Sequence, residues 1–231
     1  MPLILAAPLP SFAAPTAEAR LQRLCASWER ALATRLSPAQ LAHCRRFGTG
    51  GEALNARASR LLVRLLALRV LPQESMLDRD EHGRPRVSGT PGWQIAFSHS
   101  GSAAFCLVLG PRETASLPAG HAALDAEACG RLPPTDRGFT APAPSRRAAL
   151  RRWVLAEALF KALGAPAARW GAVATAAEHA GGARSGRWRD GADVLSWHFF
   201  AAPGHAGCVA LPGSAPFFVG LRWLAWQSLP I

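Results

Sequence analysis

A leucine-rich segment between Glu52 and Leu71 constrains the fold of this chain more than any other feature. Its apolar residues recur three or four positions apart, which is the spacing of one face of an α-helix. These residues are Leu54, Leu61, Leu62, Leu65, Leu66 and Leu68. Glycines at 48–51 precede the segment, and Pro72 ends it. The sequence therefore predicts a long helix whose apolar face is buried.

Further helices and short strands are expected on both sides of this helix. Ser37-Pro38 begins an earlier helix, because a serine cap followed by proline is a typical start signal. Another helix is expected from about Ser145 to Leu163, where Gly164 ends it. The expected strands are the first residues of the chain and residues 93–97, 103–109, 122–127, 194–200 and 208–211. This mixture predicts an α+β fold.

Composition narrows the function classes. The 231 residues are 49% hydrophobic, which indicates a globular protein with a sizeable core. No apolar run approaches the roughly 18 residues of a membrane-spanning helix, so we expect a cytoplasmic protein that has no membrane partner. The five cysteines include no C-x-x-C pair, and neither a disulfide framework nor a zinc site is indicated.

The formal charge of +11 comes almost entirely from arginine. Such a charge attracts nucleic acid, acidic proteins or phosphorylated ligands, and it does not choose among them. Lys161 is the only lysine in the chain. A lone lysine among many arginines indicates a site that needs a compact ammonium group.

Two pairs of charged residues are candidates for chemistry. Asp125 and Glu127 are two apart on an expected strand, so both carboxylates point to the same side and suit a divalent cation. Glu157 and Lys161 are four apart on an expected helix and share one face. Taken singly, each pair is also compatible with a solvated surface.

The sequence Ser98-His99-Ser100-Gly101 follows an expected strand and can bind phosphate through its side chains and backbone N–H groups. A hydrolase triad is the competing interpretation, but no glycine precedes the serine as a nucleophile elbow requires. A capped strand end is the plainest alternative.

Four short motifs in order resemble the surfactin-type 4′-phosphopantetheinyl transferases. They are Gly83-Arg84-Pro85, the strand ending in Ser98-His99-Ser100-Gly101, the strand with Asp125-Ala126-Glu127, and the helix from Trp153 to Lys161. The resemblance extends from about Leu36 to Gly164 and is specific because the separations also fit. It implies two similar α/β lobes, a pseudo-dimer, with the active site in the cleft between them. Residues 1–115 would form the coenzyme A-binding lobe, and residues 116–231 the metal-binding, catalytic lobe.

The resemblance also implies roles for individual residues. Asp125, Glu127 and Glu157 would bind Mg²⁺, and Glu157 and Lys161 would be catalytic. Coenzyme A, as co-substrate, would contact a set of residues in the first lobe: Arg45, Arg46, Arg57, Arg60, Arg84, Pro85, Ser98 and His99. The partner would be an apo acyl or peptidyl carrier protein with an acidic surface, bound by a monomer.

Two alternatives remain open from the sequence. Ala156 stands where the family usually has lysine, which motivates a non-catalytic relative that binds coenzyme A or a carrier. The charge motivates a nucleic-acid-binding protein, but no zinc-finger spacing or RNP-like aromatic motif supports it, and we expect no nucleic-acid partner.

Overall fold

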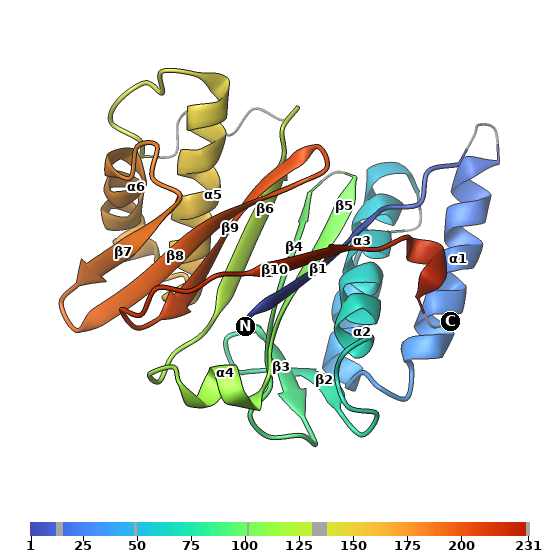
Figure 1. Cartoon of the computed structure of the whole chain (residues 1–231). Coiled ribbons are helices and arrows are strands. Elements are labelled where there is room, and N and C mark those ends of the chain that lie inside the picture. The colour runs from blue at the N-terminus through green and yellow to red at the C-terminus, as the bar shows by residue number, and fades with distance from the viewer. Residues whose placement is uncertain (13–15, 49, 101, 131–137, 230–231) are drawn as a thin grey trace.

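The structure is a computed structural model that describes residues 1–12, 16–48, 50–100, 102–130 and 138–229 (Figure 1). The first half contains β1 (Leu3–Pro8), α1 (Ala17–Leu32), α2 (Pro38–Arg45), α3 (Gly51–Leu68), β2 (Met76–Arg79), β3 (Pro85–Ser88), β4 (Gln94–Ser100) and β5 (Ala103–Leu109). The second half contains α4 (Pro111–Ala115), β6 (Ala123–Ala128), α5 (Arg146–Ala162), α6 (Trp170–His179), β7 (Ser185–Asp190), β8 (Asp193–Ala202), β9 (His205–Pro212) and β10 (Gly220–Trp223). The expectation of a mixed α+β protein is confirmed.

The elements form layers in which two sheets lie between two groups of helices (Figure 1). One four-stranded sheet has the order β10-β1-β5-β4, and the other has the order β6-β9-β8-β7, while β2 and β3 form a separate two-stranded sheet. Helices α1, α2 and α3 cover the outer face of the first sheet, and α5 and α6 cover that of the second. A third apolar cluster, which includes Phe105, Leu124 and Phe200, joins the inner faces.

The two sheets repeat one strand pattern. In the first, β1 pairs antiparallel with β5, and β5 pairs antiparallel with β4. In the second, β6 pairs antiparallel with β9, and β9 pairs antiparallel with β8. Strands β4 and β6 lie side by side where the sheets meet. We call this contact the seam.

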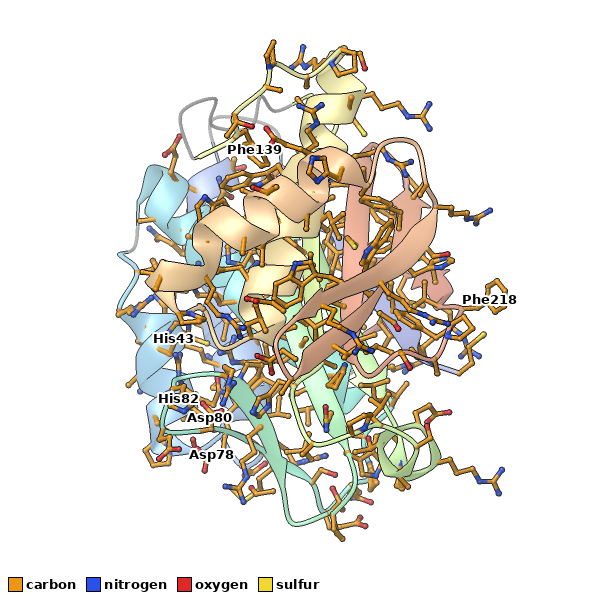
Figure 2. The ribbon with its side chains drawn as sticks, turned by 90° about the vertical axis from the view of Figure 1, so that its left-hand side faces the viewer. His43, Asp78, Asp80, His82, Phe139 and Phe218 are labelled. Atoms are coloured by element: carbon orange, nitrogen blue, oxygen red, sulfur yellow. The ribbon has the colours of Figure 1, made fainter. Side chains whose placement is uncertain are left out.

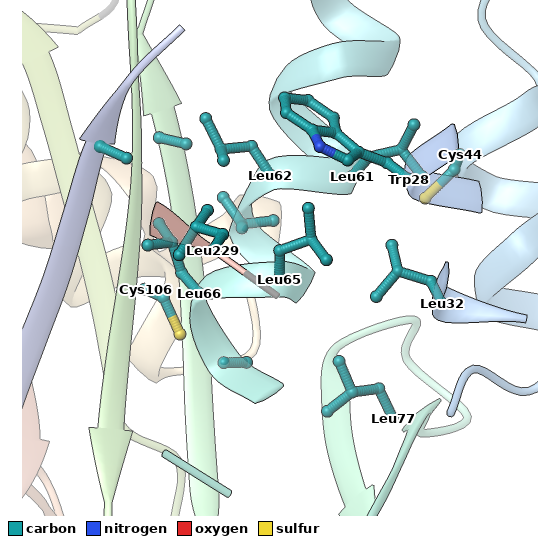
Figure 3. Close-up of a cluster of buried hydrophobic side chains, with 14 of the residues drawn as sticks. Trp28, Leu32, Cys44, Leu61, Leu62, Leu65, Leu66, Leu77, Cys106 and Leu229 are labelled. Carbon is teal, nitrogen blue, oxygen red and sulfur yellow. The ribbon is translucent and has the colours of Figure 1, made fainter. Parts of the chain in front are cut away.

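The leucine-rich helix lies where its pattern predicts. Leu61, Leu62 and Leu66 of α3 are fully buried, and Trp28 and Leu32 of α1 pack in the same cluster (Figure 3). Burying side chains of this size is worth about 1.5–3 kcal/mol each. The resulting core fixes the first sheet under α3.

Local signals explain the ends of the other predicted helices. The Ser37 hydroxyl accepts a hydrogen bond from the N–H of Gln40, and Ser145 accepts one from Ala148. Each bond satisfies a donor that the first turn of a helix leaves free. Gly164, just after α5, has φ 86°, a left-handed conformation that favours glycine.

Three expectations about the elements are corrected. The region after Gly164 does not consist of strands alone, because it contains α6. Helix α1 was not expected. Residues 98–100 belong to β4 rather than to a connecting loop. None of the helices in the described ranges is both long and apolar enough to cross a membrane.

Candidate functional site

A pocket of about 310 Å³ opens at the seam. Its lining brings together residues from β4, β6 and α5: Phe97, Ser98, His99, Asp125, Glu127, Trp153, Glu157 and Lys161. All four acidic or basic residues that the sequence singled out as metal-binding or catalytic are among them. The pocket is therefore the candidate site.

The periodicities of a strand and a helix place these charges. Asp125 and Glu127 alternate with Leu124 and Ala126, which point into the core between the sheets, so the two carboxylates share the opposite side of β6. On α5, Glu157 and Lys161 are one turn apart and face the pocket. Trp153, 7% exposed, anchors the same helix in the core.

Lys161 and Asp125 are in direct contact within the site. Lys161 Nζ donates a hydrogen bond of 2.6 Å to Asp125 Oδ1 and lies 3.9 Å from Glu157 Oε2. Burial by itself would lower the pKa of Lys161, but the carboxylates of Asp125, Glu157 and Glu127 outweigh this effect and raise it. The ammonium group therefore stays charged at neutral pH.

The second oxygen of Asp125 makes this site a candidate for a cation. Asp125 is 5% exposed, and its Oδ2 atom is buried without a hydrogen-bond partner in the described part of the chain. A buried carboxylate oxygen without a donor is costly and fits a positive ligand. As they stand, however, no three His, Cys, Asp or Glu side chains within the described ranges come close enough together to hold a metal ion.

A basic cluster borders the pocket on the α3 side. It consists of Arg46, Arg60, Arg64 and His43, with His99 at its edge. Burial, with the charges of Arg60, Lys161 and Arg64, lowers the pKa of His99 to about 4. Burial and neighbouring arginines likewise lower the pKa of His43 to about 4 and that of Arg60 to about 10. Cations crowded in this way favour an anionic ligand.

Two of the five arginines predicted to bind coenzyme A have a different partner. Arg57 lies 2.6 Å and Arg45 3.1 Å from Glu29, a carboxylate that is only 8% exposed. These contacts tie α2 and α3 to α1. The guanidinium of Arg60 instead lies 3.5 Å from the ring centre of Phe47, and that of Arg46 lies 4.9 Å from it. Arg46 and Arg60 are thus the better anion-binding candidates.

Arg84 and Pro85 lie at a second cavity, of about 270 Å³. This cavity runs along Trp93 and the first residues of β4 as far as Phe97, and it shares Phe97 and Lys161 with the first pocket. Arg84 is held in place by Asp80, whose Oδ2 lies 2.7 Å from Arg84 Nε. Figure 2 shows Asp80 and His82 on the same side of the molecule as His43.

Arg64 and His43 are functional candidates that were not predicted from the sequence. Arg64 is 3% exposed, and its Nε donates a 2.9 Å hydrogen bond to the side-chain oxygen of Gln40. Its position one turn after Arg60 was a usable signal, because residues four apart share a helix face. His43 had no comparable signal, since its place depends on how α2 packs against α3.

Comparisons with known proteins add no information about the site. A scan against protein-family models and a search of curated proteins both return no match for this chain. One local departure does have a structural account. Ala156 is fully buried in the core under α5 and does not line the pocket. Ala156 therefore contributes no side chain to the pocket.

Proposed function

We propose that this chain is a 4′-phosphopantetheinyl transferase, which moves the phosphopantetheine arm of coenzyme A onto a serine of an apo carrier protein. The observation that carries the proposal is that three carboxylates and the only lysine of the chain line one pocket beside a basic cluster. Transfer of a phosphate-linked group depends on positioning and charge neutralisation, and this arrangement supplies both.

Asp125, Glu127 and Glu157 would hold Mg²⁺. Carboxylate oxygens are the ligands that Mg²⁺ prefers, and the buried Oδ2 of Asp125, which has no hydrogen-bond partner among the described residues, is available to such an ion. When bound, the ion would neutralise the charge of the pyrophosphate. Lys161, which is hydrogen-bonded to Asp125, would stabilise the negative charge that develops on the transferred phosphate.

The reaction exchanges one phosphorus–oxygen bond for another. The hydroxyl oxygen of the carrier serine attacks the phosphorus atom that bears the pantetheine arm. The bond from that phosphorus to the bridging pyrophosphate oxygen breaks, and adenosine 3′,5′-bisphosphate leaves with the electron pair. Glu157, which lines the pocket, would accept the proton of the serine hydroxyl.

The two cavities suggest how coenzyme A would lie. Arg46 and Arg60, which stack on Phe47, would receive the 3′-phosphate. The cavity beside Arg84 and Pro85 would receive the adenine end. His99 lies between the basic cluster and Lys161, close to where the pyrophosphate would be placed.

The repeated strand pattern supports the proposal of two related lobes. In both sheets the three strands follow the same order along the chain and pair in the same antiparallel way, as β1-β5-β4 and as β6-β9-β8. Each sheet also packs against a long helix, α3 in the first and α5 in the second. A pseudo-dimer of this kind would place the site in the cleft where the lobes meet. The charge of +11 would speed encounter with an acidic carrier protein.

Catalysis by these residues is tested by removing the carboxylates singly. The variants Asp125→Ala and Glu157→Ala are incubated with coenzyme A, Mg²⁺ and an apo carrier protein, and intact mass reports attachment of the arm. We expect nearly complete loss of transfer while circular dichroism shows a folded protein. Undiminished transfer by both variants would contradict the site assignment.

A further inference from the structure

The seam between β4 and β6 is joined by side chains instead of a backbone ladder. Three side chains of β4 accept hydrogen bonds from backbone N–H groups of the β6 segment. Gln94 accepts from Ala122 at 3.4 Å, Ser98 from Ala126 at 3.1 Å, and Ser100 from Ala128 at 2.7 Å. Each pair is separated by 28 residues, so the two strands run in the same direction with a fixed register.

The two serines also donate to the carboxylates of the site. Ser98 Oγ donates to Asp125 Oδ1 at 3.3 Å, and Ser100 Oγ donates to Glu127 Oε2 at 2.8 Å. One hydroxyl can both donate and accept, so each serine fixes a backbone N–H and the preceding carboxylate together. An alanine at either position would lose both bonds.

Ser100 differs from Ser98 in its access to a ligand. Ser98 lines the pocket, whereas Ser100 is 1% exposed and does not line it. Ser100 therefore acts on a bound molecule only indirectly, through Glu127 and through the backbone of β6. Its bond to Glu127 is the shorter of the two, at 2.8 Å against 3.3 Å.

From this geometry we infer that Ser100 is a positioning residue for the metal-binding carboxylates, an inference that rests on the proposed function. Its hydroxyl holds the Glu127 carboxylate toward the pocket. Its bond to the Ala128 N–H fixes the register of β6 relative to β4. This register sets the position of Asp125 relative to α5. Groups that orient metal ligands in this way change metal affinity by about 10- to 100-fold when they are removed.

The test measures metal binding without turnover. Mn²⁺ replaces Mg²⁺ and is titrated into the protein with coenzyme A while electron paramagnetic resonance follows free Mn²⁺. Ser100→Ala should weaken Mn²⁺ binding about 10-fold or more, and Ser100→Thr, which keeps the hydroxyl, should recover most of it. Ser196→Ala is the matched control, because Ser196 is equally buried but donates to Gly213, away from the seam.

A second readout needs no metal. Amide hydrogen exchange at Ala128 should accelerate in Ser100→Ala and stay unchanged in Ser196→Ala. Unaltered exchange, or Mn²⁺ affinity equal to that of the unmodified protein, would overturn the inference and leave the proposed function standing. If the unmodified protein binds no Mn²⁺ in the presence of coenzyme A, the proposed function itself is overturned.

Discussion

Lys161 Nζ lies 2.6 Å from Asp125 Oδ1, so the only lysine in the chain is paired with the most buried carboxylate of the candidate site. The pair links α5 to β6 across the pocket. It also places a fixed positive charge where the account puts the transferred phosphate.

Replacing Lys161 should therefore affect both stability and chemistry. Lys161→Ala leaves Asp125 without its cation and should cost about 1–2 kcal/mol of unfolding free energy, since the lysine side chain is 38% exposed and the pair is partly screened. Transfer should fall by at least about 100-fold. Lys161→Arg should keep most of the stability but little of the activity, because the planar guanidinium group of arginine does not replace the compact ammonium group of lysine. Urea unfolding and the carrier mass assay measure the two effects, and full activity in Lys161→Arg would contradict the role.

The two kinds of arginine on α3 should separate in a ligand-binding experiment. Arg60→Ala should weaken coenzyme A binding about 10-fold or more, because a charge-assisted contact to phosphate is worth about 1.5–3 kcal/mol. It should leave binding of dephospho-coenzyme A, which lacks the 3′-phosphate, nearly unchanged. Calorimetric titration gives the dissociation constants of coenzyme A and dephospho-coenzyme A, and the ratio of the two constants measures the preference for the 3′-phosphate.

Arg57→Ala is the matched control for Arg60→Ala. It removes a partner of the buried Glu29 and should lower stability by about 1–3 kcal/mol without changing the preference for coenzyme A over dephospho-coenzyme A. If Arg57→Ala, and not Arg60→Ala, abolished that preference, the assignment of the basic cluster would be wrong.

Protonation of His43 should destabilise the ligand-free protein in mild acid. Its pKa is about 4 when folded, against about 6.5 in an unfolded chain. Between these values the unfolded state binds the proton and the folded state does not, so stability is lost as the pH falls from about 6.5 to about 4. His43→Gln should lose stability less steeply over this window, by at most about 1.4 kcal/mol per pH unit. Urea unfolding at several pH values gives the unfolding free energy of each protein. If it fell equally steeply with decreasing pH in both, the lowered pKa of the partly buried His43 would be contradicted.

Gly207 should be intolerant of a side chain because it lies on β9, which pairs with β6, the strand that holds Asp125. A Cβ at Gly207 would lie 2.2 Å from Phe200 Cζ and 2.8 Å from the Asp125 carbonyl oxygen. Gly207→Ala should therefore cost about 1–3 kcal/mol. Gly171→Ala in α6 is the control, since nothing lies within 4 Å of the added carbon, and it should be neutral or stabilising by up to about 1 kcal/mol. Chemical denaturation compares the two, and equal stabilities would argue against this packing.

The predictable parts of the fold are those with a strong local signal. Helices α3 and α5 have bounded apolar stripes with glycine at their ends, and β5 is a continuous apolar run. Helix α6 was missed because its small, largely apolar residues form no clear stripe. Helix α1 does carry a helical pattern, Leu21, Cys25, Trp28 and Leu32, that the sequence analysis did not use.

The site divides in the same way. The carboxylates and Lys161 could be predicted because strand and helix periodicity each placed two of them on one side. The basic cluster could not, because packing decides which arginines belong to it. Arg45 and Arg57 stay outside the cluster, since both pair with Glu29 once α1, α2 and α3 have packed. The paired bonds of Ser98 and Ser100 likewise depend on the contact between two sheets.

Intact mass spectrometry of an apo carrier protein incubated with this chain, coenzyme A and Mg²⁺ tests the account most directly. The account predicts that the carrier gains the mass of one phosphopantetheine arm, that adenosine 3′,5′-bisphosphate appears in equal amount, and that Glu157→Ala gives neither. A carrier that keeps its original mass across fatty-acid, polyketide and nonribosomal-peptide types would contradict it.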